Sequence, residues 1–122
     1  MITLHYLQCS RSFRILWALE ELGMDYQVEY YQRLPSYAAP ESLKQIHPLG
    51  KTPILVDDEN VIVESAVILD YLQQQYDVKQ QFKPQQFKDQ LQYSYWMHYA
   101  EGSLMPLLVM TLVINNVSKH VP

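Results

Sequence analysis

The segment HPLGKTPIL, residues 47–55, constrains the fold more than any other part of the chain. Its Thr52-Pro53 pair stands directly before a strand-like apolar run at 54–56. Because proline has no N–H, it is excluded from the interior of a sheet and belongs at the start of a strand. A cis bond before Pro53 would turn the chain sharply there. The N–H and C=O of Thr52 would then be free to pair with an extended peptide, as an added strand would.

A second feature, Glu64-Ser65, stands at the head of the apolar helical segment AVILDYL. At a helix N-terminus, free N–H groups and the helix dipole favour a bound carboxylate. The Ser65 hydroxyl adds a donor, and the Glu64 carboxylate can accept an ammonium group. A ligand with a peptide middle, a thiol and a zwitterionic amino-acid head suits Thr52 and this pair together. Glutathione is such a ligand.

Five pieces of the chain occur in an order that resembles the N-terminal part of a glutathione S-transferase of the bacterial and fungal serine or cysteine type. These pieces are the strand ITLHYL, the turn Cys9-Ser10-Arg11-Ser12, the helix FRILWALEELG, the Gly50-Lys51-Thr52-Pro53 loop and the Glu64-Ser65 helix start. The resemblance covers residues 2–77 and continues into YWMHYAEGSLMPLL at 95–108. Its specificity comes from the ordered set, in which Lys51 stands thirteen residues before Glu64.

The periodicity of the first part of the chain predicts an α/β domain over residues 1–77 with the element order βαβαββα. Strands are expected at 2–7, 26–31, 53–56 and 61–63, and helices at 12–23, 41–46 and 64–76. Ser12 is expected to cap the first helix, and Gly23 to end it. Alternation of Tyr26, Val28 and Tyr30 with more polar residues predicts a strand with one exposed face. The resemblance implies that this order is a thioredoxin-like domain with a mixed four-stranded sheet.

The remainder of the chain predicts a linker followed by helix. Residues 78–85 are polar and contain Pro84, which is typical of a linker. The resemblance implies that residues 86–122 are the first helical segment of an all-helical C-terminal domain, so we expect the chain to be a fragment of a longer protein. Its most apolar stretch, 104–114, is too short to span a bilayer and contains Pro106. We therefore expect a buried helix and no membrane span.

Three side chains compete to stabilise the thiolate of glutathione. Ser10 lies four residues before Arg14, the spacing of the catalytic serine that the resemblance to theta- and delta-type enzymes gives. Cys9 lies five residues before Arg14, as the cysteine does in beta-type enzymes, and Tyr6 ends the first strand in a context similar to that of the alpha-type tyrosine. We expect Ser10 first, Cys9 second and Tyr6 third, and all three stay open.

The choice among these side chains changes the reaction that the resemblance implies. A hydroxyl implies conjugation of the glutathione thiolate to small hydrophobic electrophiles. Cys9 implies a glutathione-dependent thiol transferase or reductase that forms a mixed disulfide. A third alternative is a transferase-like binding or interaction module without catalysis, because a fold does not fix a function.

The resemblance also implies a binding role for residues outside this trio. Lys51 would hold the glycine carboxylate of glutathione, Thr52 and Pro53 the cysteinyl backbone, and Glu64 with Ser65 the γ-glutamyl head. Trp96, Tyr99 and Met105 would line the electrophile pocket.

Composition limits the partners and the compartment. The net charge is −4, and the nine Lys and Arg residues form no stripe, which argues against nucleic acid. His5, His47, His98 and Cys9 lack metal-ligand spacing, so no metal is expected. The single cysteine agrees with a reducing compartment, and residues 1–10 lack a signal-peptide pattern, so we expect a cytoplasmic protein. The resemblance implies a homodimer.

Overall fold

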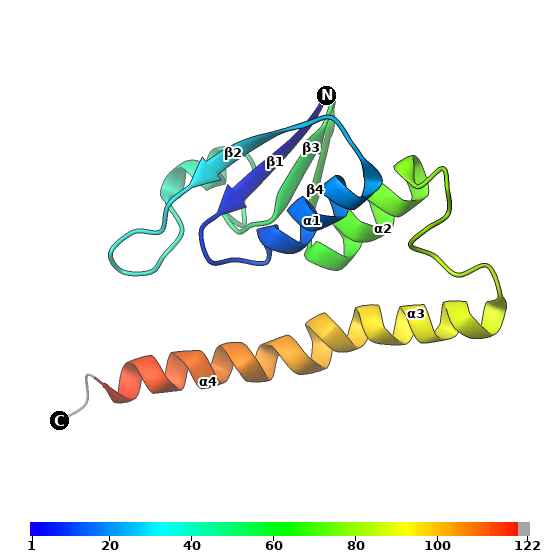
Figure 1. The fold of residues 1–122 in the computed structure, drawn as a ribbon. Helices are drawn as coiled ribbons and strands as arrows, with labels where there is room; N and C mark the ends of the chain where they lie inside the picture. The colour runs from blue at the N-terminus through cyan, green and yellow to red at the C-terminus, as the bar shows by residue number, and fades with distance from the viewer. Residues whose placement is uncertain (120–122) are drawn as a thin grey trace. The chain divides into compact units, whose positions relative to one another are not determined.

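The computed structural model describes residues 1–119 and divides the chain into two units, Met1–Lys79 and Gln80–Pro122. The first unit holds every strand of the described residues (Figure 1). Its elements are β1 (Ile2–Leu7), α1 (Ser12–Leu22), β2 (Tyr26–Tyr31), the short 3-10 helix η1 (Glu41–Gln45), β3 (Ile54–Asp57), β4 (Asn60–Val63) and α2 (Ser65–Tyr76). The predicted order βαβαββα is confirmed, with element ends within a residue or two of those expected.

The four strands form one mixed sheet in the order β2-β1-β3-β4. β1 runs parallel to β2 and antiparallel to β3, and β3 runs antiparallel to β4. In the register, Ile54 lies opposite both His5 of β1 and Val63 of β4. The ends of β1 and β4 therefore lie at the same edge of the sheet as the start of β3. The predicted α/β fold class is confirmed.

The hydrophobic core lies between one face of the sheet and the helices α1 and α2, which pack side by side (Figure 1). Strand alternation directs the side chains of Ile2 and Leu4 toward these helices, because residues two apart share a face. Burial of each such side chain contributes about 1.5–3 kcal/mol. The core side chains are Ile2, Leu4, Ile15, Leu19, Leu55, Ile68 and Leu72.

Two local predictions for the first unit are corrected by the structure. Arg11, not Ser12, is the N-cap of α1, and Ser12 is the first helical residue, with its hydroxyl bonded to the Leu7 N–H and the Ser10 hydroxyl in the preceding turn. The expected buried face of β2 is also wrong, since Val28 and Tyr30 are 42% and 57% exposed. β2 is an edge strand, and the core cluster is centred on β1 and β3.

The C-terminal end of α1 follows its sequence signal. Gly23 adopts a left-handed conformation with φ 65°, which glycine reaches without a Cβ clash. The N–H of Met24 donates to the carbonyl of Leu19 at 3.1 Å, and the N–H of Gly23 donates to Glu20 at 3.0 Å. These bonds form the Schellman pattern that closes a helix.

The second unit is one helical run of three segments, α3 (Phe87–Tyr99), the π-helical turn η2 (Ala100–Leu104) and α4 (Met105–Ser118). Pro106 does not interrupt the run, because it lies in the first turn of α4, where its missing N–H is tolerated. The π-helical turn precedes it, and the N–H of Met105 donates to the carbonyl of Ala100. No residue of the three segments is buried, so the expectation of a buried helix over 104–114 is wrong for this structure.

This helical run is longer than the apolar stretch 104–114, on which the prediction of no membrane span was based. Phe87–Ser118 comprises 32 residues, with a mean hydropathy of 1.3 in its most apolar window. By length and composition it could cross a bilayer, although core helices of soluble proteins meet the same criterion.

A buried carboxylate ties α2 to the end of β3. Asp57 is 6% exposed, and it accepts hydrogen bonds from the hydroxyl of Tyr76 and, at 2.8 Å, from the hydroxyl of Tyr71. Both bonds favour the ionised form, so they hold the pKa of Asp57 below its usual value of 3.8. The same contact with Asp57 raises the pKa of Tyr76.

We predict that this cluster makes the first unit acid-labile. Because the folded-state pKa of Asp57 is depressed, its contribution to stability is present above pH 3.8 and is lost as the pH falls through the lower, folded-state value. Hydrogen bonds to a charged group contribute about 1.5–3 kcal/mol each and neutral ones about 1 kcal/mol, so Asp57→Asn, which keeps an amide oxygen as acceptor, is expected to cost about 2 kcal/mol at neutral pH. Urea unfolding of the wild type and of Asp57→Asn at several pH values measures the difference in the free energy of unfolding.

The matched control is Asp58→Asn, because the Asp58 side chain is 80% exposed and pairs with the N-terminal amine at 2.5 Å. Exposed pairs of this kind contribute about 0–1 kcal/mol. The prediction fails if Asp57→Asn retains the steep loss of stability in acid that the wild type shows.

Candidate functional site

The edge of the sheet at which β1 and β4 end and β3 starts brings together three segments that are distant in sequence. The turn after β1, the Thr52-Pro53 pair before β3 and the start of α2 all lie there, as the strand register requires. The Thr52-Pro53 bond is cis and Pro53 is buried, which confirms the predicted turn. No backbone hydrogen bond among residues 1–119 involves Thr52, so its N–H and C=O are available to a ligand.

Ser10 occupies the centre of this edge. Its hydroxyl lies 2.7 Å from the carbonyl oxygen of Leu7 and 2.8 Å from the Ser12 hydroxyl, and it can donate to either. It accepts hydrogen bonds from the Ser12 N–H at 3.1 Å and from the Thr52 hydroxyl at 3.4 Å. The last contact spans 42 residues of sequence and joins the turn after β1 to the Thr52-Pro53 loop.

This pattern prepares the Ser10 hydroxyl to donate. A hydroxyl has one proton, so only one of its two acceptors can hold that proton at a time. The donors on its oxygen polarise the O–H bond, since hydrogen bonds in a chain strengthen one another. An anion that binds at this edge would compete with the neutral Leu7 carbonyl for the proton of the Ser10 hydroxyl. The anion would be the better acceptor, because hydrogen bonds to ionised acceptors are stronger.

Ser12 has a larger part in this edge than the sequence indicated. It is fully buried, and its hydroxyl accepts from the Leu7 N–H at 3.4 Å in addition to contacting Ser10. Sequence reasoning gave it a capping role, because a serine before an apolar helix signals an N-cap. The Ser-x-Ser spacing of residues 10–12 is the signal that could have identified it.

The two rivals of Ser10 have different surroundings. Cys9 is an exposed free thiol, and its backbone adopts a positive φ of 51°. Tyr6 packs beside the core and stacks on Tyr30, with ring centroids 5.6 Å apart. Cys9 therefore directly precedes Ser10 in the chain, whereas the ring of Tyr6 is stacked on a side chain of the neighbouring strand β2.

The start of α2 presents the second polar pair. The helix begins at Ser65, and Glu64 is its N-cap residue with φ 72°. The Glu64 carbonyl accepts the first helical bond from Ile68 at 2.9 Å, while its exposed carboxylate makes no capping bond. Ser65 is 4% exposed and occupies the first turn, where backbone N–H groups lack helical partners.

Lys51 projects from the loop that leads to Thr52. Its side chain is exposed and forms no ion pair with a described residue. Gly50 before it has φ 57°, and a Cβ there would lie 2.8 Å from Cγ of Lys44. This turn therefore requires glycine, and glycine fixes the path of the loop into Lys51-Thr52-Pro53.

The residues expected at the electrophile pocket belong to the second unit. Trp96 and Tyr99 of α3 form an aromatic group with Tyr95, whose ring centroid is 5.0 Å from that of Trp96 and 5.9 Å from that of Tyr99. Met105 is half-buried at the start of α4.

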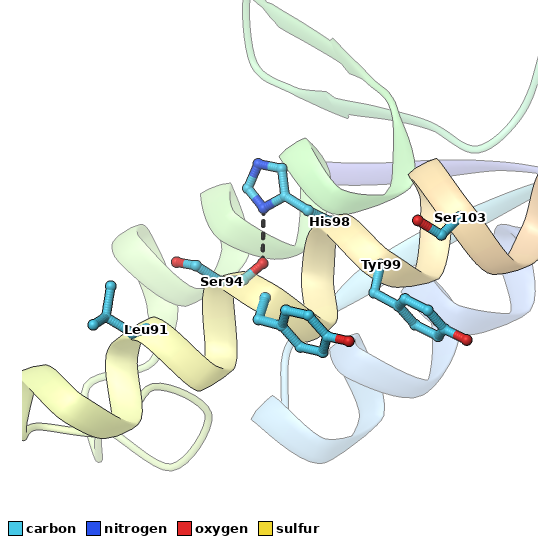
Figure 2. A pocket seen from close by; sticks show the side chains of 6 residues that line it. Leu91, Ser94, His98, Tyr99 and Ser103 are labelled. Carbon is cyan, nitrogen blue, oxygen red and sulfur yellow. Dashed lines mark hydrogen bonds between the residues drawn. The ribbon is translucent and has the colours of Figure 1, made fainter.

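An open depression of about 370 Å³ lies along α3 and η2 (Figure 2). Tyr99 is among its lining residues, whereas Trp96 and Met105 are not. The side chain of His98 is fixed beside it by a 2.7 Å bond from Nδ1 to the Ser94 carbonyl. The full lining is Leu91, Ser94, Tyr95, His98, Tyr99 and Ser103. Within residues 1–119, no three His, Cys, Asp or Glu side chains gather as a metal site would require.

The chain is similar in sequence and fold to known proteins. Residues 8–75 match the family model of the glutathione S-transferase N-terminal domain. Glutathione S-transferase 3 of Schizosaccharomyces pombe is 44% identical over 110 residues, which are 88% of this chain and 44% of that protein.

Two solved structures share the fold. A glutathione S-transferase from Actinobacillus pleuropneumoniae has a TM-score of 0.76 and 47% identity, over 79% of this chain and 46% of that one. A theta-class enzyme from Xanthomonas axonopodis pv. citri, with glutathione bound, has a TM-score of 0.70 and 25% identity, over 86% and 50% of the two chains. The chain spans about half the length of the curated relatives that it matches.

Proposed function

Because the chain belongs to the glutathione S-transferase family, we propose that it binds glutathione at the Ser10 edge of the sheet and takes part in conjugating its thiolate to small hydrophobic electrophiles. One observation carries the proposal. The Ser10 hydroxyl is hydrogen-bonded to Thr52 at the edge where the free backbone of Thr52 and the start of α2 are also placed.

In this proposal each part of glutathione has its own partner. The Thr52 N–H and C=O pair with the cysteinyl backbone above the cis Pro53. The Glu64 carboxylate and the Ser65 hydroxyl, with the free N–H groups of α2, hold the γ-glutamyl head. Lys51 neutralises the glycine carboxylate from the exposed loop.

The proposed role of Ser10 is to donate its proton as a hydrogen bond to the thiolate. A free thiol has a pKa near ~8.5, so only a few per cent is ionised at neutral pH. One hydrogen bond to a charged sulfur contributes about 1.5–3 kcal/mol. At about 1.36 kcal/mol per unit, that bond lowers the thiol pKa by about one to two units. A hydrogen bond from a single hydroxyl therefore accounts for most of the lowering of the thiol pKa that ionisation at neutral pH needs.

The exposed thiol of Cys9 supports a second candidate function, thiol transfer. The Cys9 thiolate would attack the glutathione sulfur of a mixed disulfide, forming a Cys9–glutathione disulfide and releasing the substrate thiolate. A second glutathione thiolate would then attack this bond, releasing oxidised glutathione and restoring Cys9. A transferase-like module that binds glutathione without turnover is the third candidate.

The second unit supplies the proposed surroundings of the electrophile and of a partner. Trp96, Tyr99 and Met105 are its proposed electrophile contacts, and the exposed apolar residues of α4 would pack on protein. A homodimer in the reducing cytoplasm remains the proposed state.

Substitution of Cys9 separates the first two functions. For conjugation we expect Cys9→Ala to keep at least half of the wild-type rate with glutathione and a chlorodinitrobenzene, because the hydroxyl of Ser10 is unchanged. The same variant would lose all glutathione-dependent reduction of a small mixed disulfide. Both rates are measured by absorbance on the same preparations.

The conjugation proposal fails if Cys9→Ala abolishes conjugation, or if the folded wild type binds glutathione and turns over neither substrate. The latter result would select the binding module.

A further inference from the structure

Arg33 lies in the loop after β2 and connects it to the turn after β1. Three hydrogen bonds of its guanidinium go to backbone carbonyl oxygens. Nε donates to Gln8 at 3.0 Å, one terminal nitrogen donates to Cys9 at 3.1 Å, and the other donates to Tyr37 at 2.7 Å. The planar guanidinium presents its donors in a fixed fork, which holds three acceptors in one arrangement.

Two of these carbonyls belong to residues in an uncommon backbone conformation. Cys9 has φ 51° and Tyr37 has φ 63°. Residues with a Cβ rarely adopt positive φ, and they keep it where their surroundings hold it. Arg33 therefore holds each turn at the residue whose backbone conformation is least favourable.

The bond to the Cys9 carbonyl bears directly on Ser10. The Cys9 carbonyl and the Ser10 N–H belong to one planar peptide group, so fixing the direction of one fixes the other. From that peptide group, the Ser10 side chain reaches the Leu7 carbonyl, Ser12 and Thr52. Any rotation of the Cys9–Ser10 peptide would move this hydroxyl.

We propose that Arg33 is a positioning residue for Ser10. Its guanidinium holds the 8–10 turn so that the hydroxyl faces the thiolate of bound glutathione. The positive charge also offsets the negative ends of the Gln8 and Cys9 carbonyl dipoles beside the site of the anion. This inference rests on the proposed function, because the group that it positions acts on glutathione.

A readout of the thiolate separates positioning from simple loop stability. The experiment titrates the ultraviolet thiolate absorbance of bound glutathione against pH, in the full 122-residue chain. We expect Arg33→Gln to raise the thiol pKa by about half to one unit, which lowers the thiolate fraction by about threefold to tenfold at pH values well below the wild-type thiol pKa. The rate kcat should fall equally, with KM for the electrophile unchanged. Arg33→Lys keeps the charge without the fork and should recover part of the effect.

The matched control is Lys79→Gln, which removes one positive charge from an exposed side chain beyond the end of α2. Its loss should leave the thiol pKa unchanged. The inference is overturned if Arg33→Gln binds glutathione with a wild-type thiol pKa. Should Arg33→Gln not fold, a wild-type thiol pKa in Arg33→Lys overturns it equally. A folded wild type that binds no glutathione overturns the proposed function, and the inference with it.

Discussion

Replacement of both Glu64 and Ser65 by alanine is expected to weaken glutathione binding by at least a hundredfold. The wild-type pair gives the γ-glutamyl head an anion for its ammonium group and a hydroxyl for its carboxylate. Each hydrogen bond to a charged group contributes about 1.5–3 kcal/mol. Loss of both is therefore about 3–6 kcal/mol, and each 1.4 kcal/mol is about tenfold in affinity. Calorimetric titration of both proteins with glutathione measures the change.

The chain contains a matched control for this double variant. Glu41-Ser42 is another acidic residue followed by serine, exposed and at the start of η1. Its double alanine variant should bind glutathione as the wild type does. Thermal unfolding of both variants checks that α2 remains folded. Equal affinity for glutathione in the wild type and the Glu64→Ala, Ser65→Ala chain would remove the γ-glutamyl site from the account.

Ser10→Ala is expected to lower kcat/KM for conjugation by about eightfold to twenty-fivefold at pH 7. The variant loses the hydrogen bond to the thiolate, which contributes about 1.5–3 kcal/mol, so the thiol pKa rises by about one to two units toward ~8.5. The rate of the variant should then climb as the pH rises toward that value, because glutathione ionises without help. The deficit relative to wild type should shrink in parallel.

Three further variants complete the test of Ser10. Ser36→Ala, in an exposed turn of the β2–η1 loop, should change nothing. Ser12→Ala should give an intermediate loss, because it removes the hydroxyl that contacts Ser10 at 2.8 Å but keeps the backbone N–H that donates to the Ser10 oxygen at 3.1 Å. A wild-type pH profile in Ser10→Ala, together with a large loss in Tyr6→Phe, would transfer the role to tyrosine.

The local signals in the sequence were sufficient to predict most of the first unit. Pro53 has a fixed φ and no N–H, and Gly23 reaches the left-handed conformation that other residues rarely adopt; the structure uses both as expected. The strand expected at 2–7 is confirmed as β1, and its Ile2 and Leu4 are part of the core. In each case the signal lies in a short stretch of local sequence.

Features that depend on tertiary contacts could not be predicted in the same way. A serine before a helix can cap it or bond elsewhere, and Ser12 does the latter. The exposure of Val28 and Tyr30 follows from the edge position of β2, which alternation does not reveal. Arg33 lies in a polar loop, and nothing in its sequence neighbourhood indicates that it reaches the Gln8 and Cys9 carbonyls.

The second unit shows the limit of reading apolar runs alone. The run at 104–114 is one part of a 32-residue helical stretch, because the π-helical turn allows the chain to continue through Pro106. Its length depends on a backbone adjustment that hydropathy does not encode.

The most direct test of the central claim is the thiol pKa of glutathione bound to the wild-type chain. The thiolate absorbance is followed from acid to alkaline pH at saturating glutathione, with Ser10→Ala as the reference. The account predicts a thiol pKa about one to two units below ~8.5 for the wild type. Bound glutathione that titrates as free glutathione does, in a folded wild-type chain, would contradict it.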